Sequence, residues 1–119
     1  MIVRQFLQWI RHAPPGERAE ATAALARAYL YSDLSSDDLA AAEGAMIMLL
    51  DDPSPLVRRA LADVFATSQK APPVVIRALA NDQPEIAMAI LALSPILQEA
   101  DLIDLAATAA HLTWLDLSP

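Results

Sequence analysis

The helical pattern of this protein is clearest in residues 51–107, which read DDPSPLVRRALADVFATSQKAPPVVIRALANDQPEIAMAILALSPILQEADLIDLAA. The stretch contains one unit twice: an aspartate- and proline-containing start, a helix with apolar residues three or four positions apart, a break, and a further helix. The two starts, at residues 51–55 and 81–85, each contain a proline, which fits the first turn of a helix, and Ser54 can cap the helix that begins at Pro55. Two such units about 30 residues apart predict a stack of helical hairpins, an α-solenoid.

The apolar residues of each unit indicate the face that we expect to be buried against a neighbouring unit. A hairpin cannot cover this face alone, so hairpins stack. In the second unit the first helix is about one turn shorter, and Asp82 and Glu85 are expected to form a capping-box pair. The inward residues are Leu56, Val57, Ala60, Leu61, Val64, Phe65, Val75, Ile76 and Leu79 in the first unit, and Ile86, Ile90 and Leu91 in the second.

Residues 1–50 are predicted to form three helices that begin the stack, over residues 2–12, 17–31 and 36–50. Ser35 is the expected N-cap of the third helix, with Asp38 completing the box. Gly44 costs that helix about 1 kcal/mol relative to alanine, so we expect a close helix contact there. The predicted inward residues are Ala21, Ala24, Leu25, Ala28 and Tyr29 in the second helix, and Leu39, Ala42, Met46, Met48, Leu49 and Leu50 in the third.

The chain is therefore predicted to be a single domain, residues 1–119, with N-terminal helices in 1–50, two hairpin repeats in 51–110 and a tail in 111–119. The fold class is all-α: a short right-handed α-solenoid of about seven helices and no strands. Alanine-rich composition with 5% aromatic residues agrees with helices. The alternative is a compact helical bundle in which the repeat is accidental.

Charge and composition exclude several classes of protein. The formal net charge of −7 repels phosphate backbones and anionic membrane surfaces, so neither nucleic acid nor a membrane is an expected partner. Without cysteine there is no disulfide framework, thiolate metal site or cysteine nucleophile. Arg4 interrupts the N-terminal apolar run, so residues 1–12 do not resemble a signal peptide. We expect a cytoplasmic protein.

No residue pattern predicts a catalytic, cofactor-binding or metal-binding site. His12 and His111 are the only histidines, and neither has the spacing of a metal motif or a catalytic triad. The paired acids at residues 37–38 and 51–52 lie at helix starts, where capping and the helix dipole already favour carboxylates. We therefore expect no enzyme activity and no cofactor.

Two groups of residues could form an interaction surface. Arg58, Arg59 and Arg77 are the basic residues of the first unit and could bind a phosphate or an acidic peptide. For Arg58 the simpler interpretation is a salt bridge between repeats, with Arg59 solvated. The second group is in the apolar tail: Trp114, Leu115 and Leu117. The tail could cap the last helix, pair with another copy of the chain to give a homo-oligomer, or mark a fragment of a longer repeat protein.

Residues 51–62, together with Ser68, residues 71–80, 93–95 and 101–102, resemble a bacterial and mainly alphaproteobacterial family, domain-of-unknown-function 2336. The same pattern is similar to HEAT-type and leucine-rich-repeat-variant repeats. The resemblance covers about two thirds of the chain and implies a HEAT-like fold. It implies no particular chemistry, because this fold has many roles.

The resemblance to HEAT-type repeats also implies a brace between neighbouring units. In such repeats an aspartate in the turn and an arginine in the following helix hold adjacent units together. Asp52 and Arg58 match these positions in the first unit. In the second unit Asp82 matches, but Met88 replaces the arginine, so the row of braces is expected to stop there.

The function expected from the sequence is a non-enzymatic protein–protein interaction or regulatory module. An extended helical surface with net negative charge suits a protein partner of basic or mixed charge. A nucleic-acid-binding or DNA-repair enzyme of HEAT-like fold is the first alternative, although 8 basic against 15 acidic residues disfavour it. The second alternative is a structural module that associates with itself.

Overall fold

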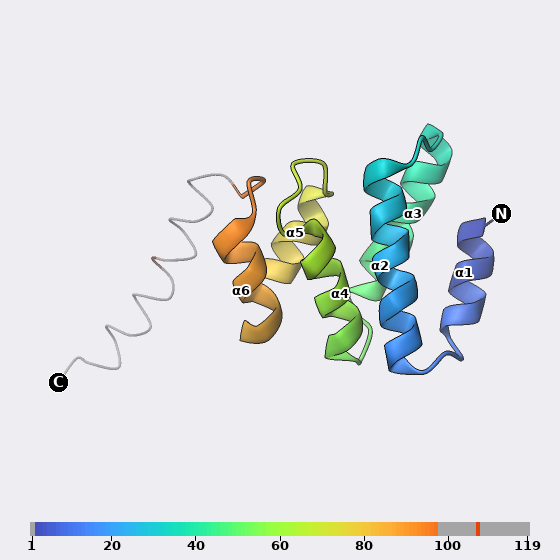
Figure 1. Ribbon diagram of the computed structural model, residues 1–119, viewed down its shortest axis with the longest axis horizontal. Helices are drawn as coiled ribbons and strands as arrows, with labels where there is room; N and C mark the ends of the chain where they lie inside the picture. The colour runs from blue at the N-terminus through green and yellow to red at the C-terminus, as the bar shows by residue number, and fades with distance from the viewer. Residues whose placement is uncertain (1, 98–106, 108–119) are drawn as a thin grey trace.

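The computed structural model describes residues 2–97 and residue 107, and these contain six α-helices and no strands (Figure 1). The all-α prediction is confirmed for this part of the chain. The expected seventh helix and the tail fall on residues 98–119, outside the described residues apart from residue 107. The helices are α1 (Ile2–Ile10), α2 (Pro15–Tyr31), α3 (Ser36–Leu49), α4 (Pro55–Phe65), α5 (Pro73–Ala80) and α6 (Pro84–Leu93).

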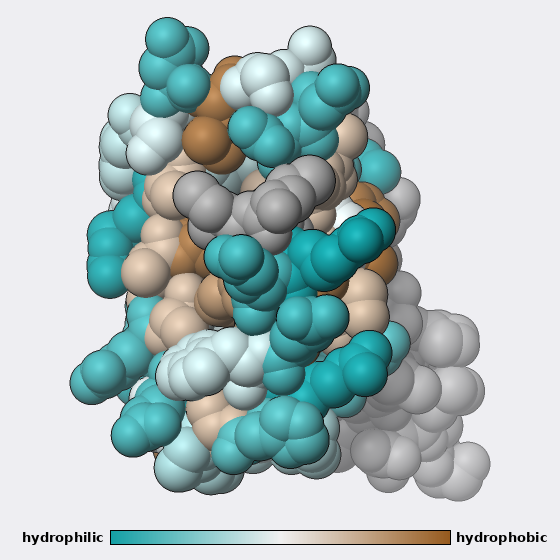
Figure 2. Space-filling model, turned by 90° about the vertical axis from the view of Figure 1, so that its right-hand side faces the viewer, coloured by the Kyte–Doolittle hydropathy of each residue, from teal (hydrophilic) through white to brown (hydrophobic). Residues whose placement is uncertain are grey.

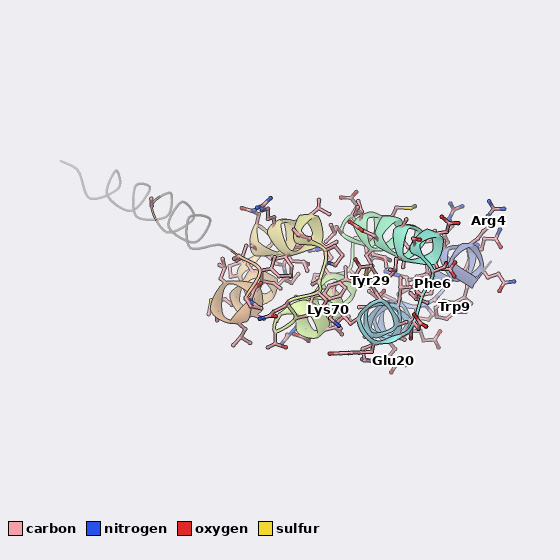
Figure 3. The ribbon with its side chains drawn as sticks, turned by 90° about the horizontal axis from the view of Figure 1, so that it is seen from above. Arg4, Phe6, Trp9, Glu20, Tyr29 and Lys70 are labelled. Atoms are coloured by element: carbon pink, nitrogen blue, oxygen red, sulfur yellow. The ribbon has the colours of Figure 1, made fainter. Side chains whose placement is uncertain are left out.

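The helices form two rows, between which the chain alternates. In one row α2, α4 and α6 lie side by side, begin at the same edge and run in the same direction (Figure 1). In the other row α3 and α5 cover them, and α1 packs beside α3 at the N-terminal end (Figure 3). Short connections therefore join helices of opposite direction, as in hairpins. The right-handed solenoid expected from the sequence stays a prediction.

The core lies between the two rows. Phe65, Leu61 and Val57 of α4 are fully buried, and Val75, Ile76 and Leu79 of α5 face them from the other row. Each such side chain stabilises the fold by about 1.5–3 kcal/mol. The Phe65 ring also meets the edge of Tyr29 from α2, with ring centroids 6.3 Å apart. These contacts make α4 the central helix of the described structure.

The prediction of burial is wrong for several residues. In α2 the buried stripe is Thr22, Ala26 and Leu30, while Ala24 is exposed, because α2 turns this stripe toward the core between α3 and α4. Thr22 is fully buried, and its hydroxyl has no hydrogen-bond partner among the described residues. Three further residues predicted as core are exposed because their positions lie off the buried stripes of their helices: Met48, Leu56 and Leu91.

The expectation of a close helix contact at Gly44 is also wrong. Gly44 is exposed, and a Cβ atom added there would meet no atom of the described residues within 4 Å. Packing in the described structure therefore does not require a glycine at this position. The glycine only costs the helix conformational entropy.

The helix starts are confirmed at Ser35 and Ser54, but not at Asp82. Ser35 Oγ accepts a hydrogen bond from the Asp38 N–H at 3.1 Å, and Ser54 Oγ accepts from the Leu56 N–H at 3.3 Å. The predicted capping pair of Asp82 with Glu85 does not form, because Gln83 is the N-cap of α6. The Asp82 carboxylate instead accepts from the Gln83 N–H and from an arginine of α4.

Candidate functional site

A brace joins α4 to the connection before α6. Arg58 Nε donates to Asp82 Oδ2 at 2.8 Å, and a second guanidinium nitrogen donates to Asp82 Oδ1 at 3.4 Å. The third nitrogen donates to the main-chain carbonyl of Asp52 at 2.6 Å. Both charged side chains are largely buried, with 15% and 16% of their surface exposed. The salt bridge that we favoured for Arg58 is therefore present, and it joins the two units predicted from the sequence.

A second brace of the same design joins α2 to the connection before α4. Arg18 of α2 donates to both Asp52 oxygens, at 3.1 and 3.0 Å, and to the carbonyl of Ala13 at 2.8 Å. Arg18 was not predicted to form a brace. A signal was available, since Arg18 and Arg58 each stand three residues after the proline that begins their helix. Asp52 therefore pairs with the arginine of the preceding unit, and its own carbonyl accepts from Arg58.

The row of braces ends at Asp82 in the described chain. Counted from its first proline, α6 has Ala87 where α4 has Arg58. Aligning Asp82 with Asp52 pointed to Met88 instead, because α6 begins two residues after Asp82 whereas α4 begins three residues after Asp52. Neither residue can donate a hydrogen bond from its side chain. In the described residues the row of braces therefore stops where we predicted, but the residue that stands in place of the arginine is Ala87.

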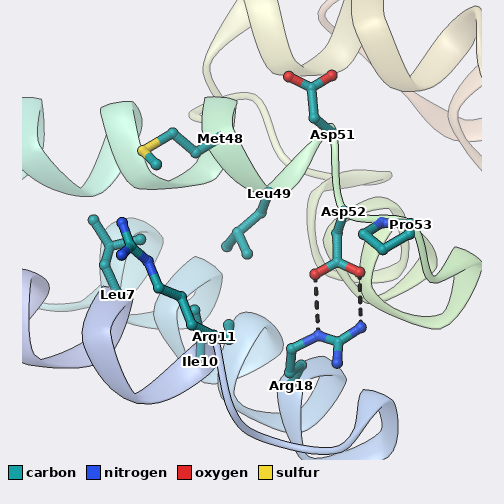
Figure 4. A pocket seen from close by; sticks show the side chains of 9 residues that line it. All are labelled: Leu7, Ile10, Arg11, Arg18, Met48, Leu49, Asp51, Asp52 and Pro53. Carbon is teal, nitrogen blue, oxygen red and sulfur yellow. Dashed lines mark hydrogen bonds and ion pairs between the residues drawn. The ribbon is translucent and has the colours of Figure 1, made fainter.

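The Arg18–Asp52 brace forms one wall of a pocket at the N-terminal end of the molecule. The pocket has a volume of about 340 Å³ and lies between the last turns of α1 and α3 (Figure 4). Leu7 and Ile10 enter it from one side and Met48 and Leu49 from the other. Its lining is mainly apolar, with charged groups at the edges. The lining residues are Leu7, Ile10, Arg11, Arg18, Met48, Leu49, Asp51, Asp52 and Pro53.

Met48 gives this pocket an adaptable apolar wall. Its side chain is 56% exposed, whereas Met46, on the inner side of the same helix, is fully buried. Arg11 and Asp51 are exposed at the rim and carry opposite charges. At the α1 end of the molecule, the surface has hydrophobic patches among mainly hydrophilic side chains (Figure 2). The pocket therefore suits a partner with an apolar side chain and flanking polar groups.

A shallow groove of about 560 Å³ follows the outer side of α2 and α4. At four positions the floor has only glycine or alanine, so another chain could approach the helix backbones closely. Its rim carries two acidic and two basic residues. The groove is lined by Gly16, Ala19, Glu20, Ala23, Arg27, Leu56, Arg59, Ala60, Asp63 and Val64.

The predicted interaction residues do not form one surface. Arg58 is held in its brace, whereas Arg59 lies on the groove, 3.9 Å from Asp63, with both side chains about 60% exposed. Arg77 is exposed on α5, in the other row. The predicted tail residues lie outside the described residues: Trp114, Leu115 and Leu117. The role of these residues in binding stays a prediction.

Among the described titratable groups, Tyr29 is the one whose pKa is clearly shifted from its usual value. Burial raises the pKa of its phenol above the usual value, and the negative charge of Glu43 raises it further. The residue lies at the contact of α2 with α3 and α4, away from the pocket lining. Its position against Phe65 indicates a packing role.

Comparison of the chain with protein-family models, with curated proteins and with solved structures gives no match. The resemblance to domain-of-unknown-function 2336 and to HEAT-type repeats therefore stays a prediction from the residues. Among residues 2–97 and 107, no helix is long and apolar enough to cross a membrane.

Proposed function

We propose that the protein is a non-enzymatic protein-binding module, and that its pocket between α1 and α3 accepts an apolar side chain from a partner segment. The observation that carries the proposal is the open apolar pocket beside the Arg18–Asp52 brace. Its volume of about 340 Å³ is at the lower end of the range of about 300–1,000 Å³ that is typical of ligand sites. A single large side chain suits this volume better than an extended cofactor.

The chemistry of the lining supports a peptide as the ligand. Leu7, Ile10 and Leu49 offer apolar contact, and the flexible thioether of Met48 can adapt to different side chains. The brace fixes the polar wall, because its bidentate geometry holds Arg18 and Asp52 against each other. Arg11 and Asp51 at the rim favour a segment of mixed charge around the apolar anchor. The proposed setting is a cytoplasmic role in bacterial signalling or regulation.

A peptide-display selection against the protein tests this proposal, with two variants that change an exposed methionine. Met48→Glu places a charge in the pocket, whereas Met88→Glu makes the same change on α6, where Met88 is 65% exposed. We expect selected peptides to contain an apolar anchor and to lose at least tenfold in affinity for the Met48 variant. Affinity for the Met88 variant should stay within about twofold of the unmodified protein.

Two results would contradict the proposal. One is an equal loss of affinity in both methionine variants, which would separate binding from the pocket. The other is a clear shift of labelled duplex DNA at physiological salt by the unmodified protein. That shift would favour the alternative of a nucleic-acid-binding protein, against the net charge of −7.

A further inference from the structure

The groove between α2 and α4 is a second concave surface, separate from the peptide pocket. Its floor contains Gly16, Ala19, Ala23 and Ala60, so the two helix backbones lie close to the surface. Leu56 stands at one end of the groove with 56% of its side-chain and main-chain surface exposed. Small side chains and an exposed leucine are suited to contact with another helix pair.

The four charged residues of the groove alternate in sign along both helices. Glu20 and Arg27 are on α2, and Arg59 and Asp63 are on α4. Because α2 and α4 start at the same edge and run in the same direction, height follows residue number (Figure 1). At a rise of 1.5 Å per residue, Glu20 and Arg59 lie roughly 6–8 Å from the helix starts, and Asp63 and Arg27 roughly 12–18 Å. The signs therefore form a two-by-two chequered pattern.

This pattern is complementary to itself. When a two-fold axis runs along the groove, α2 of one copy faces α4 of the other, level for level. Glu20 then meets Arg59 and Arg27 meets Asp63, and the symmetry repeats both pairs. In the described part of the single chain, Glu20 and Arg27 form no ion pair, and Arg59 has only the long contact to Asp63. Figure 3 shows Glu20 on the outer side of α2, away from the row of α3 and α5.

We propose that this groove is the interface of a symmetric dimer of the chain. Two helices of about 10 Å diameter and roughly 16–25 Å length cover about 300–500 Å² on each copy. This area lies below the standard size for a stable complex. The dimer is accordingly weak, with a dissociation constant in the micromolar range, and it weakens with salt because exposed charges align the two copies.

Sedimentation velocity of the full chain at roughly 10–500 µM, in low and high salt, tests the dimer with three variants. Glu20→Arg and Arg59→Glu each place like charges opposite one another, and each should weaken self-association by at least tenfold. The double variant E20R/R59E restores opposite charges on the two-fold axis and should recover the dimer. An equimolar mixture of the two single variants should form a heterodimer. Circular dichroism checks that every variant is folded, since these charges are exposed.

Three results would overturn the proposal. The first is a monomer at every concentration. The second is self-association that neither single charge reversal changes, which would place the interface elsewhere. The third is a double variant that stays monomeric while the unmodified protein dimerises, because this would exclude the pairing of α2 with α4. None of these results bears on peptide binding at the pocket, which Met48→Glu tests separately.

Discussion

Replacing Arg58 by alanine should lower the free energy of unfolding by about 2–3 kcal/mol. The change removes two hydrogen bonds to Asp82 and one to the carbonyl of Asp52. The largely buried Asp82 carboxylate then keeps, among the residues that the structure describes, only the N–H of Gln83 as a donor. A fully buried pair would cost about 3–5 kcal/mol, and the exposed 15–16% of these side chains lowers that figure.

Urea unfolding followed by circular dichroism at 222 nm measures this loss. The matched control is Arg59→Ala, one residue further along the same helix, whose ion pair is 3.9 Å long and exposed. That control should change the free energy by no more than about 0.5 kcal/mol. In a domain of this size the Arg58 variant should also melt roughly 10–20 °C earlier. Equal effects of the two variants would refute the idea that the brace holds α4 to the connection before α6.

Three further predictions concern single positions, each measured by reversible unfolding. Gly44→Ala should raise the free energy of unfolding by about 0.5–1 kcal/mol, since the added methyl group meets open space; a loss would contradict the exposed position. Thr22→Val should raise it by about 1 kcal/mol because it removes a buried hydroxyl without a partner, and no gain would mean that the hydroxyl is satisfied. Tyr29 should destabilise the fold at alkaline pH because the pKa of its phenol is raised in the folded chain. Above about pH 10 the unfolded chain loses the phenol proton, whereas the folded chain retains it. Stability should therefore fall as pH rises from about 10 through the folded pKa, and Tyr29→Phe should make this fall shallower; parallel pH profiles would argue against it.

Local signals in the sequence predicted the helices well. Ser35, Ser54 and Pro55 start helices where capping chemistry places them, because that chemistry depends on a few neighbouring residues. The stop in the row of braces after Asp82 was predicted from the resemblance to HEAT-type repeats, because the second unit lacks the matching arginine. The capping pair at Asp82 failed because the carboxylate pairs with Arg58, 24 residues away in the sequence.

Features that depend on packing between helices could not be predicted. Met46 and Met48 look alike in the sequence, yet only Met46 faces the core, since the contact of α3 with its neighbours fixes which side is buried. Arg18 was missed because its Pro-Pro-Gly start differs from the Asp-Pro-Ser-Pro start before Arg58. The pocket itself arises from the way α1 packs beside α3, a contact for which the sequence gives no pattern.

The most direct test of the proposed function is a map of amide and methyl NMR shifts when a selected peptide is added to the full chain. We expect the largest changes to cluster at Leu7, Ile10 and Met48, which line the pocket. Residues of the α2–α4 groove, such as Ala23 and Ala60, should change little when the protein concentration is held constant. Shifts centred on the groove, or spread evenly over all six helices, would contradict a binding pocket between α1 and α3.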